Sequence, residues 1–256
     1  MSKLPKEHKF IDLSDYGRPF AKVIANALKN TSFTPIHVTI AFIIAGIVAI
    51  YCIVHSHYWL AAFFLILKSI LDAADGELAR VKQKPSYTGR YLDSVADILL
   101  NALFFIAIGY IASTPIWICI GAFLGLQLQG TLYNYYYVIL RNKFDGDTTS
   151  RVFENKTPIA LPGEKQKHVN ILFGMYKVLY GAFDKTIYAL DSNAHKGAAL
   201  PKWFMTSVST FGLGFQLLLI AILLVLNLKS YILPFFLGYT LMVLVFITIR
   251  KILYKS

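Results

Sequence analysis

The sequence is short of charged residues, and it contains few acidic residues and few cysteines. Only 15% of its 256 residues are charged, whereas soluble domains have about a quarter. Because 56% of the residues are also hydrophobic, we exclude an ordinary soluble domain and expect an integral membrane protein. Cys52 and Cys119 both fall in long apolar runs, so a disulfide framework is not expected. The first 35 residues are too polar for a cleavable signal peptide.

Six apolar segments have roughly the 20 residues that a helix needs to cross a bilayer. The predicted spans cover residues 36–55, 59–80, 89–112, 115–141, 203–227 and 231–250. We therefore expect an all-α integral membrane protein with six transmembrane helices. The predicted six-helix domain occupies residues 36–256 and includes a long cytoplasmic connection at 142–201. Residues 1–35 form a cytoplasmic N-terminal segment.

The N-terminal segment is expected to contain one amphipathic helix. Residues 1–16 are polar and are expected to be loosely ordered. From Gly17 to Asn30, apolar residues including Phe20 and Val23 recur at helical spacing, which predicts a helix lying in the membrane interface. The alternative is a soluble amphipathic helix.

The later part of the chain gives weaker predictions. In the long connection, Val169–Leu190 is apolar with few charges, which predicts a second interfacial helix or a hairpin. Gly212 and Gly214 are expected to allow close packing in the fifth span.

The end of the fourth span is unusually polar and aromatic. Most tyrosines of residues 133–137 are expected to form an interfacial belt. Gln127, Gln129 and Asn134 are expected to face a cavity or a neighbouring helix.

Five of the fourteen acidic residues gather in the stretch Asp72–Asp97, although apolar runs flank it on both sides. Asp72 and Asp75 are spaced i, i+3 at the end of one predicted helix, and Asp93 and Asp97 are spaced i, i+4 at the start of the next. Each pair therefore shares a helix face. Carboxylates beside hydrocarbon are rare unless they face a partner or a water-filled cavity. Four carboxylates brought together would suit a hard divalent cation such as Mg²⁺ or Mn²⁺.

Small and basic residues accompany these carboxylates. Gly76, Ala79 and Gly89 add little bulk, so that a ligand could approach the backbone closely. Arg80 offers a fork of donors that suits phosphate oxygens. The combination indicates phosphate chemistry at a membrane face.

The alternative is that the carboxylates are structural and pair with Lys68, Arg80 or Arg90. Lys68 lies four residues before Asp72, which makes one such ion pair plausible.

The stretch resembles the signature of the CDP-alcohol phosphotransferase family. The matching pattern is Asp72-x-x-Asp75-Gly76-x-x-Ala79-Arg80, then eight residues, then Gly89-x-x-x-Asp93-x-x-x-Asp97. Thr34, Pro35 and Thr39 also match the family's first span, whereas Ile36 stands where Asn is expected. The resemblance implies a membrane enzyme, usually a homodimer, that transfers a phosphoalcohol from a CDP-alcohol to an acceptor hydroxyl and releases CMP.

The resemblance also implies a role for each signature residue. Asp72, Asp75 and Asp93 would bind one or two divalent metals. Asp97 would be the general base and would also contact a metal. The residues that line the CDP site would be Gly76, Ala79, Arg80 and Gly89.

The net charge of +11 is unevenly placed. All but two lysines and arginines lie on the predicted face of the signature, the exceptions being Lys68 within a span and Lys229 on the opposite face. The positive-inside rule then predicts cytoplasmic termini and a cytoplasmic active site. The expected location is a bacterial or archaeal cell membrane. The excess charge favours contact with anionic membrane lipid. No pattern of basic and aromatic residues indicates a nucleic-acid partner.

The substrates are less well defined than the reaction. The modest chain length favours CDP-diacylglycerol as donor and a small polar alcohol as acceptor. The alternative is transfer from CDP-choline or CDP-ethanolamine to diacylglycerol. A phosphorylated acceptor would need further cations, for which Arg141, Arg151 and Lys202 are candidates.

Two hypotheses from other functional classes remain. One is an ion transporter that uses the intramembrane carboxylates, against which their clustering near one face argues. The other is a scaffold without activity, against which the intact Asp97 argues.

Overall fold

The computed structural model describes residues 4–144, 156–196 and 199–253. Every regular element in these ranges is helical, which confirms the all-α prediction. The elements are η1 (Lys6–His8), η2 (Leu13–Asp15), α1 (Arg18–Leu28), α2 (Pro35–Val54), α3 (Tyr58–Val81), α4 (Tyr87–Ile111), α5 (Ile116–Lys143), α6 (Gln166–Leu190), α7 (Lys202–Val208), η3 (Ser209–Phe211), α8 (Leu213–Val225), α9 (Lys229–Tyr239) and α10 (Leu241–Leu253).

Four tight turns end their helices in the same way. Ser56, Gln83, Ser113 and Asn227 follow α2, α3, α4 and α8 with φ between 52° and 60°. In each turn, the amide after this left-handed residue donates to the carbonyl five residues earlier, as Lys84 does to Ala79 over 3.1 Å. This is the bonding of a Schellman motif, which satisfies the last carbonyls of a helix. α3 therefore ends at Val81.

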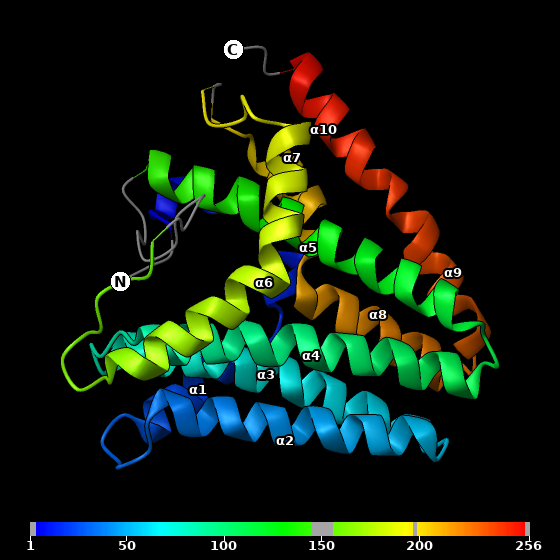
Figure 1. Ribbon diagram of the computed structural model, residues 1–256, viewed down its shortest axis with the longest axis horizontal. Coiled ribbons are helices and arrows are strands. Elements are labelled where there is room, and N and C mark those ends of the chain that lie inside the picture. Colours follow the sequence, from blue (N-terminus) through cyan, green and yellow to red (C-terminus); the bar gives the residue numbers. More distant parts are fainter. Residues whose placement is uncertain (1–3, 145–155, 197–198, 254–256) are drawn as a thin grey trace.

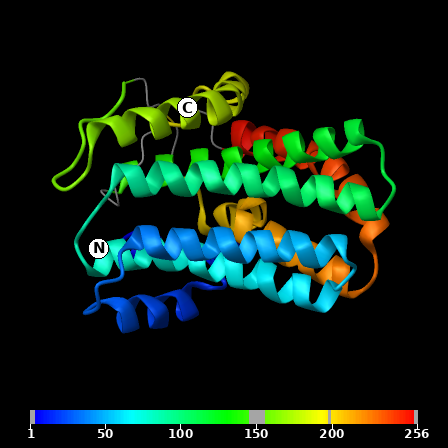
Figure 2. The same ribbon diagram turned by 60° about the horizontal axis from the view of Figure 1, so that its bottom comes forward.

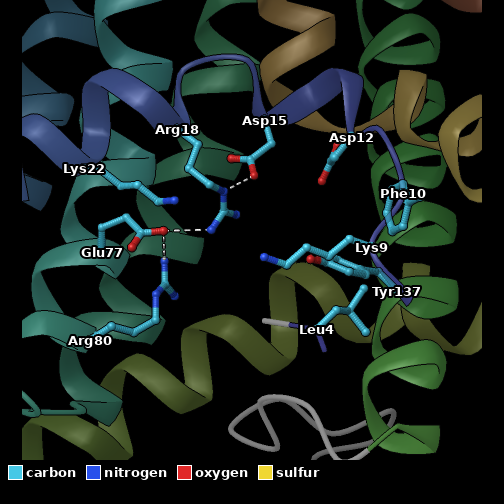
Figure 3. A pocket seen from close by; sticks show the side chains of 10 residues that line it. All are labelled: Leu4, Lys9, Phe10, Asp12, Asp15, Arg18, Lys22, Glu77, Arg80 and Tyr137. Atoms are coloured by element: carbon cyan, nitrogen blue, oxygen red, sulfur yellow. Dashed lines mark hydrogen bonds and ion pairs between the residues drawn. The ribbon is translucent and has the colours of Figure 1, made fainter. Parts of the chain in front are cut away.

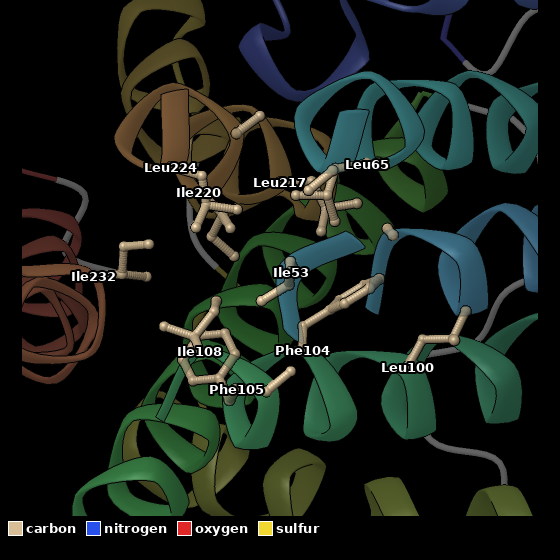
Figure 4. Packing of buried hydrophobic residues seen from close by; sticks show 14 of the residues in the cluster. Ile53, Leu65, Leu100, Phe104, Phe105, Ile108, Leu217, Ile220, Leu224 and Ile232 are labelled. Carbon is tan, nitrogen blue, oxygen red and sulfur yellow. The ribbon is translucent and has the colours of Figure 1, made fainter. Parts of the chain in front are cut away.

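The long helices pack around a shared apolar core. α2 packs against both α3 and α4, with α8 against α3 and α9 against α5 (Figures 1 and 2). The main cluster joins these helices through side chains such as Leu65, Phe104 and Ile220, each with 0% exposure (Figure 4). A second cluster lies between α5, α7 and α10 and includes Leu4 from the N-terminal segment.

Several helices are long and apolar enough to cross a membrane. Within the described residues these are α2, α4, α5 and the continuous stretch Lys229–Leu253. A fifth span results if α7, η3 and α8 count as one helix bent by 54°. α3 has 24 residues, enough to cross the hydrocarbon core, but its charges keep it outside this set. The six-span arrangement therefore stays a prediction.

Exposed aromatic side chains mark the end of the bundle opposite the signature. Trp59 at the start of α3, Tyr110 at the end of α4, Trp117 at the start of α5 and Tyr231 at the start of α9 are all more than 60% exposed. Aromatic rings at this level are typical of a membrane–water interface.

The N-terminal segment differs from the sequence-based expectation. Residues 4–16 are packed onto the bundle, so the prediction that this part is loosely ordered is wrong for the described residues. The Leu13 amide donates to Ser209 Oγ over 2.9 Å. Ser14 lies against Gly212 and Gly214, where a Cβ atom would collide with it. The two glycines do allow close packing, but of the N-terminal segment.

The helix predicted over Gly17–Asn30 is present as α1. Ala21 and Ala25 are buried against α3, whereas Phe20 and Val23 are 62% and 68% exposed. The helix is thus docked by its alanines together with the partly buried Ile24 and Leu28, whereas Phe20 and Val23 point away from the protein. Its interfacial location stays a prediction. α6 covers the predicted Val169–Leu190 segment as one helix, so the hairpin alternative is wrong.

The polar end of α5 is only partly as expected. Gln129 faces neighbouring helices, since its Nε2 donates to Phe236 O and it accepts from Gln216 over 3.0 Å. Gln127 is also buried. Asn134 is exposed, so its predicted inward position is wrong.

The predicted tyrosine belt is also wrong for three of its members. Tyr133, Tyr135 and Tyr136 are all buried. Their hydroxyl groups have polar partners inside the protein, as Tyr136 has in Asp191 at 2.7 Å. These partners lie in other parts of the chain and make burial of the hydroxyl groups possible.

Candidate active site

The carboxylates of the signature meet between the second half of α3 and the start of α4. One carboxylate oxygen each from Asp72, Asp75 and Asp93 lie within 4.8 Å of one another. The i, i+3 spacing puts Asp72 and Asp75 on one face of α3, and Asp93 reaches them from the second turn of α4. Asp75 is buried and accepts a hydrogen bond from Thr39 Oγ1 of α2 over 2.7 Å.

This cluster fits a divalent cation. Three carboxylate oxygens form the hard donor set that Mg²⁺ and Mn²⁺ prefer. Asp93 Oδ1 is buried and has no hydrogen-bond partner among the described residues. Buried polar atoms nearly always have a partner. A bound cation would be the missing partner of this oxygen.

Asp97 is joined to the cluster by Lys68. The Lys68 ammonium group pairs with Asp72 over 3.1 Å and also forms an ion pair with Asp97. Lys68 is completely buried and lies over the Phe42 ring. The ion pair between Lys68 and Asp72, which the alternative hypothesis predicted, is thus present. It occurs together with the carboxylate cluster and does not replace it. The contact of Lys68 with Asp97 was not predicted from the sequence, although a lone lysine in an apolar run indicates a buried ionic partner.

The structure shows the immediate neighbours of the residues that are expected to line a CDP site. Arg80 folds back over Gly76 and pairs with Glu77 over 2.9 Å. Gly89 lies in the first turn of α4, where its amide donates to Ser86 Oγ, and it faces Ile36 of α2. Ala79 is partly buried. Their role in nucleotide binding therefore stays a prediction.

Two of the additional cations predicted for a phosphorylated acceptor lie on different helices. Arg141 is buried, with its guanidinium group 5.0 Å from the centre of the Tyr137 ring. Lys202 is exposed at the start of α7. Arg151 lies outside the described residues.

The start of α4 is fixed by a residue of the long connection. Glu164 accepts hydrogen bonds from Ser86 Oγ and the Thr88 amide, both over 2.7 Å, and from the Tyr87 amide over 3.2 Å. These groups would otherwise be unsatisfied at a helix N-terminus. Partial burial alone would raise the pKa of Glu164, but the hydrogen bonds from Ser86 and Thr88 outweigh it and lower the pKa.

Glu164→Gln should lower the thermal stability by about 0.5–2 kcal/mol at pH 7, the usual effect of losing a helix cap. Because the folded-state pKa is lowered, the charged carboxylate stabilises the protein fully above the ordinary value of 4.5. This contribution disappears as the pH falls through the folded-state pKa. The difference in melting temperature between wild type and variant, measured in detergent, should therefore be largest at pH 7 and shrink progressively as the pH is lowered below 4.5. Glu7→Gln, at an exposed carboxylate, is the control, and a difference that does not shrink on acidification would contradict the assignment.

α6 covers α4 beside the carboxylates. Tyr91 of α4 packs with Val169 and Phe173 of α6. Tyr180 donates to the Ser94 carbonyl over 2.9 Å, immediately after Asp93 in the chain. The long connection therefore shields the second half of the signature.

Comparison with known proteins agrees with this geometry. A bifunctional IPC transferase and DIPP synthase of Thermococcus kodakarensis is 31% identical over 148 residues, which are 57% of this chain and 33% of that protein. An archaetidylinositol phosphate synthase of Pyrococcus horikoshii is 38% identical over 88 residues, which are 34% of this chain and 47% of that protein. The matches thus span between a third and a half of these relatives. The family model for CDP-alcohol phosphatidyltransferase matches residues 32–161, about half of the chain, including the whole carboxylate cluster. The chain therefore belongs to the CDP-alcohol phosphatidyltransferase family.

Proposed function

We propose that the protein is a membrane enzyme that transfers a substituted phosphate group from a CDP-linked lipid alcohol to a small polar alcohol. The donor would be CDP-diacylglycerol or a similar lipid, and CMP would be released. The observation that carries this proposal is the cluster of Asp72, Asp75 and Asp93, with Asp97 held beside it by Lys68. We further propose a homodimer with its active site and both termini in the cytoplasm.

The proposed roles follow from these contacts. Asp72, Asp75 and Asp93 would hold Mg²⁺ or Mn²⁺, with Asp97 as a further ligand. The bound cation would polarise the phosphoryl group and offset charge on the departing CMP. Asp97 would take the proton of the acceptor hydroxyl, and Lys68 orients its carboxylate. Thr39 fixes the Asp75 carboxylate. Arg80 would bind phosphate oxygens, and Gly76, Ala79 and Gly89 leave room for the nucleotide.

The test is CMP release by the purified protein in detergent with CDP-diacylglycerol and Mg²⁺. Inositol phosphate, glycerol phosphate, inositol and serine are offered in parallel as acceptors. Inositol phosphate is placed first because the Pyrococcus horikoshii relative is named for such a product. Release with one acceptor is the expected result. No release with any of them, nor from CDP-choline or CDP-ethanolamine with diacylglycerol, would contradict the proposal.

Asp75→Ala should weaken Mn²⁺ binding by more than about 100-fold, because a proposed ligand is lost. Thr39→Val should weaken it by about tenfold, since only the partner that orients this carboxylate is removed. Isothermal titration calorimetry with Mn²⁺ measures both effects without turnover. Binding that is unchanged in Asp75→Ala would exclude this residue as a ligand.

A further inference from the structure

A pocket of about 380 Å³ lies between the N-terminal segment, α1, the signature end of α3, and α5 (Figure 3). The pocket is separate from the carboxylate cluster but shares its helix. Arg80 lines the pocket and follows Asp75 by five residues, a rise of about 7–8 Å along α3. Arg80 also covers Gly76 of the signature. A ligand in this pocket would therefore contact Arg80, a residue of the signature, on the helix that carries Asp72 and Asp75.

Four cationic side chains converge on this pocket. Lys9 enters from the N-terminal segment, Arg18 and Lys22 from α1, and Arg80 from α3, and Figure 3 shows their charged ends directed toward the cavity. Three of these four residues come from the first 22 positions, a part of the chain from which the sequence predicted no site residue.

The acidic residues of the pocket leave part of this charge available. Glu77 is buried and accepts from both Arg18 (2.7 Å) and Arg80 (2.9 Å). Each guanidinium group has five N–H donors, so each keeps donors beyond those used on Glu77. Within the described residues neither Lys9 nor Lys22 forms an ion pair.

The remaining acidic side chains are held by neighbouring groups. Asp15 pairs with Arg18. Asp12 accepts from the Ser14 amide and hydroxyl and from the Tyr133 hydroxyl. Four cations face three carboxylates whose oxygens are largely occupied, which is an arrangement suited to an anion.

We propose that this pocket binds a phosphate group carried by the acceptor, so that the enzyme selects a phosphorylated small alcohol over the free alcohol. The inference rests on the proposed function. Lysine and arginine donors form strong charge-assisted hydrogen bonds with phosphate oxygens. The volume is in the range of small-ligand pockets, and the position beside Arg80 places the acceptor next to the signature. Lys9 and Lys22 are the specificity-determining residues, and the Arg18–Glu77–Arg80 cluster forms the back of the pocket.

The test compares acceptor kinetics in Lys9→Ala, Lys22→Ala and the double variant. Loss of one charged hydrogen bond corresponds to about tenfold in affinity. The KM for inositol phosphate should therefore rise about tenfold in each single variant and further in the double variant, more than kcat falls. The KM for CDP-diacylglycerol should stay within twofold. Lys29→Ala is the matched control, because Lys29 is exposed on the far end of the same helix, and its kinetics should equal those of the wild type.

Three results would overturn the proposal. In the first, the variants keep the wild-type KM for inositol phosphate. In the second, the KM for CDP-diacylglycerol rises instead, which would assign the pocket to the donor. In the third, the variants differ from wild type only in vesicles that contain anionic lipid, which would assign the pocket to a lipid headgroup.

Binding of inorganic phosphate separates this proposal from the function on which it rests. Calorimetry should detect phosphate binding to the wild type and to Lys29→Ala, and at least tenfold weaker binding to the double variant. If the wild type released no CMP with any acceptor, the proposed function would fail. Phosphate binding measured by calorimetry would then be the remaining test of whether the pocket binds phosphate. Equal phosphate binding by wild type and double variant would overturn it.

Discussion

Asp97→Asn is expected to abolish CMP release while binding of the CDP-alcohol stays within a few-fold of wild type. Asparagine has nearly the shape of aspartate and keeps an oxygen toward Lys68, with which Asp97 forms an ion pair. It cannot accept the proton of the acceptor hydroxyl. Removing a general base lowers turnover by about 10²–10⁴-fold. CMP release is measured for the variant, and binding of the CDP-alcohol is measured by calorimetric titration. Comparing the two separates a loss of chemistry from a loss of binding.

The control for this variant is Asp184→Asn, which changes a carboxylate of α6 outside the cluster. It should retain wild-type turnover. Near-normal turnover by Asp97→Asn would show that another group accepts the proton. Loss of CDP-alcohol binding in the same variant would instead make Asp97 a binding residue first.

Asp191→Ala is expected to cause the largest loss of stability. Asp191 is 1% exposed and forms an ion pair with Arg250, which is 3% exposed. It also accepts from the Tyr136 hydroxyl over 2.7 Å. Its removal leaves a buried guanidinium group without its carboxylate, which costs about 3–5 kcal/mol. For a chain of this size the melting temperature in detergent should fall by roughly 6–20 °C.

A double variant distinguishes the charge effect from the loss of packing. Asp191→Leu combined with Arg250→Met removes both charges, and it should recover most of the stability that Asp191→Ala loses. A double variant that melts as low as the single variant would show that the hydrogen bonds to Tyr136, rather than the unpaired Arg250, dominate.

Local spacing accounts for what could be predicted from the sequence. The shared helix face of Asp72 and Asp75 follows from their separation of three residues. Their approach to Asp93 follows from two helices joined by a short turn, and the structure confirms it to within 4.8 Å. The pairing of Lys68 with Asp72 was open to prediction for the same reason, because both lie on one helix.

Contacts between distant parts of the chain account for what could not be predicted. Residues 4–16 look like a solvated tail because their polar groups find partners only in the fold, such as Ser209 for the Leu13 amide. Tyr136 resembles a member of an interfacial belt until Asp191 and Arg250 are brought to its hydroxyl group. Neither partner is visible in the local sequence pattern.

The seating of the N-terminal segment also sets an order of assembly during synthesis. Leu13 and its partner Ser209 are 196 residues apart, and Gly212 and Gly214, which receive Ser14, follow directly. At 5–20 residues per second, the ribosome needs roughly 10–40 s to make the intervening chain. The cationic pocket can therefore close only after the carboxylate-bearing helices are complete. A nascent chain that stops before η3 would carry the whole signature and still lack the docking site for the segment that brings Lys9 to the pocket.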